Sequence, residues 1–168
     1  PSIDWHWVRK ELFRMERISP SKTAVASCAD KCLGLAKKFV KPRTTRVEKT
    51  VSAIKADFLE FPEEYLKKSE KVVLFVVTLG GQLEERSSEL MSSGDALEGY
   101  LLDRIGSIAV ESLAGSMEEY LRGRFCGKNK SVSMRFSPGY CDWPIEEQFK
   151  VAKILDFRKA GVRLTDRC

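Results

Sequence analysis

Residues 71–81, KVVLFVVTLGG, decide the fold class of this 168-residue chain. The first eight are rich in β-branched side chains and have the length of a strand, so we expect a strand over residues 71–78, central to a sheet. Gly80 and Gly81 then turn the chain into a helix that ends at Gly94. The two glycines do not indicate a nucleotide-binding loop, because neither Gly-Lys-Ser/Thr nor the Gly-x-Gly-x-x-Gly spacing accompanies them.

Helices dominate the sequence on both sides of this strand. The spacing of apolar residues and the positions of Pro and Gly predict helices over residues 4–17, 21–40, 82–94, 95–121 and 144–161, with a short one opening at Phe61. Further strands are expected within residues 43–59, over 131–136 and from Val162. This order lacks a regular βαβ alternation, so we predict an α+β fold in a single domain over residues 1–168, with residues 1–42 as its N-terminal helical part.

The composition is that of an ordinary soluble protein, with 43% hydrophobic and 32% charged residues. The longest apolar run, residues 72–77, is too short to cross a bilayer, so no membrane association is expected. No signal-peptide pattern opens the chain, which predicts a cytoplasmic location. The chain begins at Pro1 without a methionine, which is compatible with a missing N-terminal piece.

The net charge of +5 is concentrated in one part of the sequence. Eight Lys and Arg residues between residues 30 and 55 are accompanied only by Asp30 and Glu48. This stretch is either a docking face for an acidic partner or an ordinary solvated surface, since charge alone does not distinguish the two. Few aromatic residues interleave with the cations, which argues against binding of single-stranded nucleic acid.

Cysteine and histidine give little support for a metal or catalytic centre. The five cysteines are an odd number in a chain without a secretion signal, so a disulfide framework is not expected. Cys28 and Cys32 would share a helical face, either as half of a metal site or as small buried apolar residues. His6 is the only histidine, which excludes a histidine cluster and a nucleophile–base triad. We therefore predict neither a metal site nor catalytic residues.

Residues 135–144, RFSPGYCDWP, form the most informative local motif. Two prolines and a glycine within ten residues predict a rigid irregular loop. The guanidinium of Arg135 beside it can bind a carboxylate or phosphate through two parallel hydrogen bonds. This loop is either the wall of a pocket for a small anionic or zwitterionic ligand, or a tight turn with Arg135 in an internal salt bridge.

This loop also carries a family resemblance. The supporting motifs are LGGQLEER at residues 79–86, GDALE at 94–98, LDRIGS at 102–107, WPIEEQ at 143–148 and GVRLTD at 161–166. Together they resemble the activation domain of cobalamin-dependent methionine synthase, and more narrowly its free-standing homologues. The resemblance runs from about Val72 to the end of the chain, and a weaker resemblance is found at the start of the chain. It implies a central antiparallel sheet with flanking helices.

The resemblance further implies a site for S-adenosylmethionine. Arg135 would hold the ligand carboxylate, the backbone at Ser137 and Gly139 would meet its polar edges, and Tyr140 would cover its body. Asp4, in an Ile-Asp-Trp context, either contacts the same ligand or is the N-cap of the first helix. The family's acidic ligand contacts have no counterparts here, since Gly115 and residues 128–130 occupy the nearest positions. A further ligand-contacting tyrosine lies beyond the family's Leu-Thr-Asp, so we expect the chain to be truncated or disordered beyond Cys168.

The function implied by this family is the reactivation of cobalamin by reductive methylation. An electron from a flavodoxin-like donor and a methyl group from S-adenosylmethionine restore methylcobalamin, which is held by a methionine synthase module on a partner chain. The chain would then be a component of, or an accessory to, a methyltransferase that positions the methyl donor. Two alternatives remain: an activator of another corrinoid methyltransferase, and a non-enzymatic interaction module that has lost the ligand.

Overall fold

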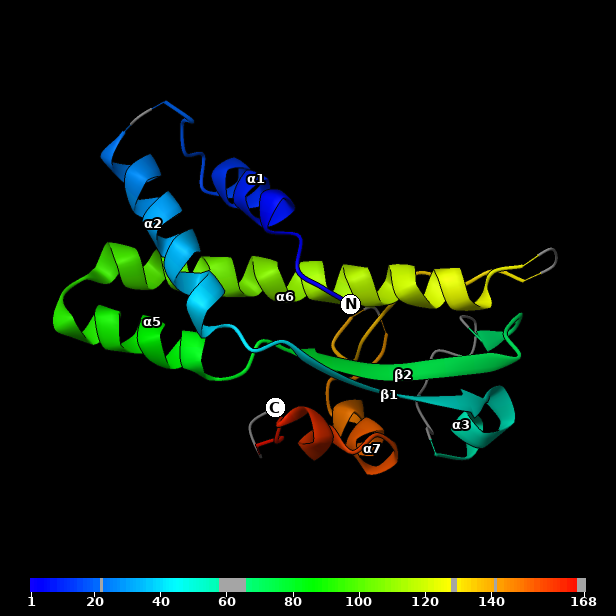
Figure 1. The fold of residues 1–168 in the computed structure, drawn as a ribbon. Coiled ribbons are helices and arrows are strands. Elements are labelled where there is room, and N and C mark those ends of the chain that lie inside the picture. The colour runs from blue at the N-terminus through cyan, green and yellow to red at the C-terminus, as the bar shows by residue number, and fades with distance from the viewer. Residues whose placement is uncertain (22, 58–65, 128–129, 141, 166–168) are drawn as a thin grey trace. The chain divides into compact units, whose positions relative to one another are not determined.

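The computed structural model of the chain describes residues 1–21, 23–57, 66–127, 130–140 and 142–165. It has helices together with a two-stranded antiparallel sheet, which confirms the predicted α+β class (Figure 1). The chain divides into two compact units, each made of two stretches of sequence. We call Pro1–Pro42 with Leu79–Val132 the helical unit, and Arg43–Thr78 with Ser133–Cys168 the sheet unit.

The helical unit is built around one long helix. Helices α1 (Trp5–Met15), α2 (Ala24–Phe39) and α5 (Gln82–Ser93) all pack against α6 (Ala96–Phe125), as Figure 1 shows. Apolar side chains along α6 are buried. Although α6 has 30 residues, neither it nor any other helix in the described parts of the chain is long and apolar enough to cross a membrane.

Helices α5 and α6 approach each other closely where they cross. The hydroxyl of Ser87, which is buried, donates a hydrogen bond of 2.8 Å to the carbonyl oxygen of Gly99. A Cβ atom at Gly99 would lie 2.6 Å from Cγ of Met91 and 2.9 Å from the carbonyl oxygen of Ser87. The absence of a side chain at Gly99 therefore allows this close crossing. Gly94, with φ of 97°, ends α5 as predicted.

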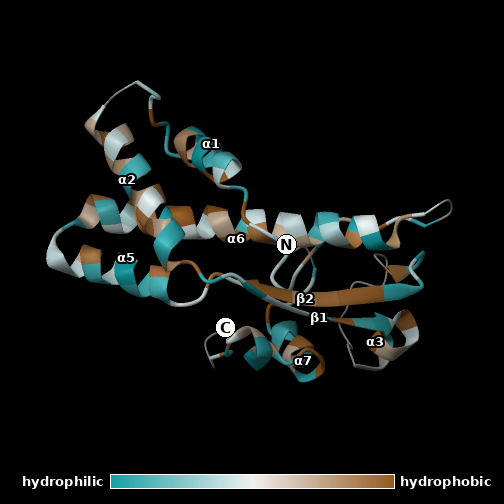
Figure 2. Ribbon diagram, in the orientation of Figure 1, coloured by the Kyte–Doolittle hydropathy of each residue, from teal (hydrophilic) through white to brown (hydrophobic). Residues whose placement is uncertain are grey.

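The described residues of the sheet unit contain a pair of antiparallel strands and several short helical segments. Strand β1 (Arg43–Thr50) leads into α3 (Val51–Asp57), and β2 (Lys71–Thr78) returns antiparallel to β1. Helix α7 (Glu147–Ile154) and the 3₁₀ helix η1 (Phe157–Ala160) follow near the end of the chain. Figure 2 shows that β2 is hydrophobic along almost its whole length.

The sheet unit has its own hydrophobic core. In the register of the two strands Val47 lies opposite Leu74, and alternate residues of β1 are half-buried while those between them are exposed. The buried members of the core come from a strand, from helices and from irregular segments: Ile54, Leu66, Leu74, Trp143, Val151 and Leu155. Burial of these side chains is the main source of stability for this unit.

Three of the strand predictions are wrong in part or in full. Strand β2 has the predicted bounds, but among the described residues it pairs only with β1 and is not central to a sheet. Residues 131–136 form no strand, and the guanidinium of Arg122 donates to the carbonyl oxygen of Val132 over 2.8 Å. No strand begins at Val162, because its amide donates to the carbonyl oxygen of Phe157 in the turn that ends η1.

The helix predictions need smaller corrections. Pro144 does not lie in the first turn of α7, since a single turn joining the Glu147 amide to the Pro144 carbonyl oxygen precedes that helix. The helix predicted to reach Gly161 ends at Ile154, and η1 follows it. Residues 43–57 contain one strand and then α3, whose first turn is capped by Thr50. Helix α6 continues to Phe125, four residues beyond the end predicted at residue 121. The helix expected to open at Phe61 lies outside the described residues.

Candidate functional site

The loop predicted to bind a ligand is a tight turn in the sheet unit, held by its own backbone. Gly139 adopts a φ of 90°, a conformation that favours glycine. Its amide donates to the carbonyl oxygen of Trp143 over 2.8 Å, and the Tyr140 amide donates to the carbonyl oxygen of Ser137 over 3.1 Å. The Trp143 amide in turn donates to the Tyr140 carbonyl oxygen over 3.2 Å. The backbone of this turn is therefore defined without any ligand.

Burial alternates along the residues that lead into the turn. Arg135 and Ser137 are exposed, whereas Phe136 between them is half-buried. The Phe136 ring packs edge-on against buried Trp143, with 5.7 Å between the ring centroids. Because Phe136 is anchored to the core, its two neighbours face solvent. The side chain of Tyr140 is also 66% exposed.

Four of the five predicted site residues thus lie in one turn and are accessible: Arg135, Ser137, Gly139 and Tyr140. An exposed guanidinium and an exposed phenol within six residues can bind an anion and cover a flat ligand, respectively. The amides of Gly139 and Tyr140 are engaged inside the turn.

Asp4, the fifth predicted residue, lies in the helical unit and caps α1. One oxygen of its carboxylate accepts hydrogen bonds from the amides of His6 and Trp7, over 3.0 and 2.9 Å. Its own amide donates to the hydroxyl of Ser112 on α6 over 2.9 Å. The N-cap prediction for Asp4 is therefore confirmed, and these contacts account for an aspartate at this position.

Glu147 is a chemically notable residue that sequence reasoning missed. It is the first residue of α7, it is only 3% exposed, and one oxygen of its carboxylate pairs with the ammonium of Lys150. Its other oxygen is buried and has no hydrogen-bond partner among the described residues. The positive end of the α7 dipole favours a carboxylate in this position. The available sequence signal was the second of two glutamates that follow Trp143-Pro144-Ile145, a pattern that also occurs in exposed first turns.

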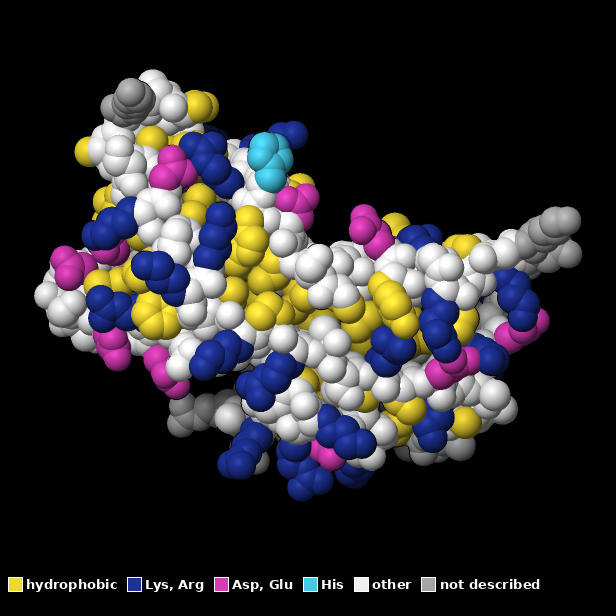
Figure 3. Space-filling view, in the orientation of Figure 1, with side chains coloured by type: hydrophobic (Ala, Val, Ile, Leu, Met, Phe, Trp, Pro, Cys, Tyr) yellow, Lys and Arg dark blue, Asp and Glu magenta, His cyan; other side chains and the backbone are white. Residues whose placement is uncertain are grey.

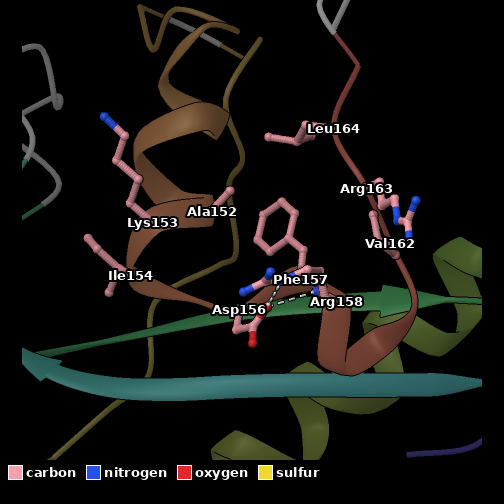
Figure 4. Close-up of a pocket in the computed structure, with 9 residues that line it drawn as sticks. All are labelled: Ala152, Lys153, Ile154, Asp156, Phe157, Arg158, Val162, Arg163 and Leu164. Carbon is pink, nitrogen blue, oxygen red and sulfur yellow. Dashed lines mark hydrogen bonds and ion pairs between the residues drawn. The ribbon is translucent and has the colours of Figure 1, made fainter.

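A hollow of about 580 Å³ lies elsewhere in the sheet unit, between α7 and residues 162–164 (Figure 4). None of the five predicted site residues is among the nine that line it. Sequence analysis could not identify this hollow, because it depends on how α7, η1 and the segment after Gly161 fold against one another.

Among the cysteines that the structure describes, Cys32 is buried and Cys126 is exposed. Burial raises the pKa of the Cys32 thiol to about 12, so this group stays protonated at neutral pH. Cys28 is half-buried one helical turn away. In the described part of the chain, no three His, Cys, Asp or Glu residues are grouped so that they could hold a metal ion. Exposed His6 adds nothing to such a centre.

The basic stretch between residues 30 and 55 is divided between the two units. On α2, Lys31 pairs with Glu98 of α6 over 2.6 Å, and the ammonium of Lys37 lies 5.6 Å from the centroid of the Trp5 ring. These cations therefore have partners within the helical unit. The docking face for an acidic partner stays a prediction.

Comparison of the sequence with protein-family models and with curated proteins finds no match. The family resemblance therefore rests on the motifs themselves, and foremost on residues 135–140. What this turn can do must be judged from its geometry and tested directly.

Proposed function

We propose that the chain binds S-adenosylmethionine at the turn of residues 135–140 and supports the reductive methylation of cobalamin. The observation that carries this proposal is a turn whose backbone is fixed internally while Arg135 and Tyr140 face solvent. A binding element that is formed before the ligand arrives loses little conformational entropy on binding.

Each residue of the turn has a distinct proposed role. The guanidinium of Arg135 holds the carboxylate of the ligand through charge-assisted hydrogen bonds. The backbone at Ser137 and Gly139 meets the polar edges of the ligand, and the carbonyl oxygen of Gly139 serves here because its amide is engaged with Trp143. The ring of Tyr140 covers the apolar body of the ligand.

S-adenosylmethionine and cobalamin supply the reacting groups, and the chain positions the methyl donor. S-adenosylmethionine carries an electrophilic methyl group, which is destined for reduced cobalamin on a methionine synthase module. A flavodoxin-like protein provides the electron. The proposed location of the activity is the cytoplasm. Positioning is sufficient for such a transfer, since no side chain has to exchange a proton with the methyl donor. The chain is thus an accessory to a methyltransferase.

Two rival functions fit the same fold. The chain could serve a different corrinoid methyltransferase, in which case it would capture a different cobalamin-binding protein. Alternatively, it could be an interaction module that no longer binds the ligand. The first rival binds the same ligand as the proposed function but a different partner protein, whereas the second rival does not bind the ligand.

Calorimetric titration of S-adenosylmethionine into the chain separates the proposal from the second rival. We expect saturable binding at one site. Absence of binding at millimolar ligand would overturn the proposal in favour of the interaction module. For a chain that binds, capture of cobalamin-containing proteins on the immobilised chain identifies the corrinoid partner: methionine synthase is expected, and another methyltransferase would support the first rival.

A further inference from the structure

The hollow in the sheet unit combines an apolar interior with a cationic rim. Its lining residues fall within one short stretch of sequence: Ala152, Lys153, Ile154, Asp156, Phe157, Arg158, Val162, Arg163 and Leu164. The five apolar members are half-buried, whereas the three cations are exposed. Its volume of about 580 Å³ lies in the range that small-ligand sites in proteins occupy.

The interior is formed by apolar side chains from three segments. In Figure 4 the ring of Phe157 projects from η1 into the space between Ala152 on α7 and Leu164, whose side chain points toward α7. Phe157 also packs against the core of the sheet unit. A flat or branched apolar group could therefore lie against Phe157 and be removed from water.

Positive charge surrounds this interior. The hollow has three cations against one carboxylate, that of Asp156, and this carboxylate is already engaged with Arg158 through contacts of 3.1 Å to its side chain and 3.2 Å to its amide. Arg158 therefore holds the pKa of Asp156 below its usual range. Lys153 and Arg163 add two further positive charges, and in Figure 4 their side chains lie on opposite sides of the Phe157 ring with their charged ends directed away from it.

Further cations lie close to the hollow. Lys159 is exposed on η1. The guanidinium of Arg43 lies against Gly161, and a Cβ atom added at Gly161 would be only 2.6 Å from a guanidinium nitrogen of Arg43. Figure 3 shows Lys and Arg side chains gathered over this part of the sheet unit. Such a group of like charges attracts an anion and repels a cation.

We propose that this hollow is a binding site for a small organic anion with an apolar body, which lies against Phe157 while the exposed cations of the rim, Lys153, Arg158 and Arg163, attract its charged group. The apolar interior disfavours a bare inorganic anion, because such an ion would lose its hydration there. The described residues that line the hollow all lie within residues 152–164. This confinement favours a compact ligand over an extended acidic peptide. The site is separate in sequence from residues 135–140 and does not depend on the function proposed above.

The test is a titration of the whole chain, labelled with ¹⁵N, with naphthalene-2-sulfonate and with its uncharged analogue naphthalene-2-sulfonamide. We expect saturable shifts of amide resonances within residues 152–164, and about fivefold tighter binding of the anion. Lys153→Gln and Arg163→Gln should each weaken the anion about two- to fivefold and leave the uncharged probe unchanged. Phe157→Leu should weaken both probes about threefold.

The control variant is Lys10→Gln, which removes an exposed cation on α1 in the helical unit and should change neither affinity. Circular dichroism of each variant establishes that it is folded. Equal affinity for the two probes, shifts confined to residues outside 152–164, or unchanged binding by both cation variants would overturn the site. A hexaglutamate peptide that shifts these amides when naphthalene-2-sulfonate does not would also overturn it, in favour of an acidic protein segment.

Discussion

The amide of Gly139 donates a hydrogen bond of 2.8 Å to the carbonyl oxygen of Trp143, and this bond closes the turn that carries the candidate site. Trp143 is buried in the core of the sheet unit, so the hydrogen bond fixes an exposed turn to a rigid base. The positive φ of Gly139 is what allows its amide to reach back to Trp143. This arrangement holds Arg135 and Tyr140 where both are exposed to solvent.

Replacement of Gly139 by alanine should weaken the turn. The substitution forces a side chain into the left-handed region and places its Cβ 3.3 Å from Cδ1 of Ile145. We expect the free energy of unfolding to fall by about 1 kcal/mol, together with a loss of affinity for S-adenosylmethionine. Urea denaturation and calorimetry measure the two effects. Gly127→Ala, where a Cβ meets nothing within 4 Å, is the matched control. Equal stability of the two variants would show that the turn tolerates a side chain.

The crossing of α5 and α6 makes a sharper prediction about stability. Gly99→Ala would bring a Cβ to 2.6 Å from Met91 and 2.9 Å from a backbone oxygen of Ser87, so the helices must separate. We expect a loss of about 2 kcal/mol in thermal or urea unfolding. Gly115→Ala lies in the same helix with nothing within 4 Å of the new Cβ, and should raise stability by up to about 1 kcal/mol. A neutral Gly99→Ala would contradict the close crossing.

Two substitutions of Asp4 separate its capping role from a role in binding. Serine also caps helices well, so Asp4→Ser should keep the stability of the helical unit within about 0.5 kcal/mol, whereas Asp4→Ala should lose about 1 kcal/mol. Because the observed contacts of Asp4 account for it as a cap, we expect Asp4→Ser to bind S-adenosylmethionine like the unchanged chain. Weaker binding by a fully stable Asp4→Ser chain would assign its carboxylate to the ligand.

Glu16 makes the stability of the helical unit depend on pH. The Tyr100 hydroxyl and the Arg104 guanidinium donate to its carboxylate over 2.6 and 2.7 Å, and these bonds lower the pKa of Glu16. A lowered pKa means that the contribution is complete above the ordinary carboxyl range and is lost as the pH falls through the folded-state pKa. We expect Glu16→Gln to cost about 1 kcal/mol at pH 7.

That difference should stay constant from pH 7 down to the ordinary carboxyl range, and should then shrink as the pH falls through the folded-state pKa of Glu16. Urea denaturation of the chain and of Glu16→Gln over this range measures it. Glu11→Gln, which removes an exposed pair with Arg14, is the control and should show a much smaller difference at every pH. A Glu16→Gln effect that is independent of pH would mean that packing rather than charge is responsible.

Local sequence signals predicted local structure well. The β-branched run gave the bounds of β2, Gly94 marked the end of α5, and Asp4 marked the start of α1. Each of these depends on backbone propensity or on a cap within a few residues. The turn at residues 135–140 was foreseen for the same reason, since proline and glycine restrict the backbone wherever they occur.

Features that depend on distant partners were missed. Met15 and Val25 continue the apolar spacing of α1 and α2, yet they are 45% and 42% exposed. Helix α2 instead buries small residues such as Ala29 and Ala36, which suit a close approach to α6 but give a weak hydrophobic signal. Residues 131–136 form no strand, and the carbonyl oxygen of Val132 accepts a hydrogen bond from the Arg122 guanidinium, ten residues earlier.

The candidate sites divide in the same way. The exposed turn with Arg135 follows from adjacent residues, whereas the hollow requires α7, η1 and residues 162–164 to fold together. Buried Glu147 is similar, because its motif is visible in the sequence but its burial is not. No periodicity distinguishes a glutamate that faces the core from one that faces solvent in a helix of eight residues.

The most direct test of the proposed function is the affinity of S-adenosylmethionine for the chain, for Arg135→Ala and for Arg14→Ala, measured by calorimetry. Arg14 is an exposed arginine on α1 that pairs with Glu11, so it matches the charge change without touching the turn. We predict that Arg135→Ala weakens binding tenfold or more, as expected for a lost charge-assisted pair, and that Arg14→Ala leaves the Kd unchanged. Equal affinity of all three chains, or no binding by any of them, would contradict the assignment of residues 135–140 as the ligand site.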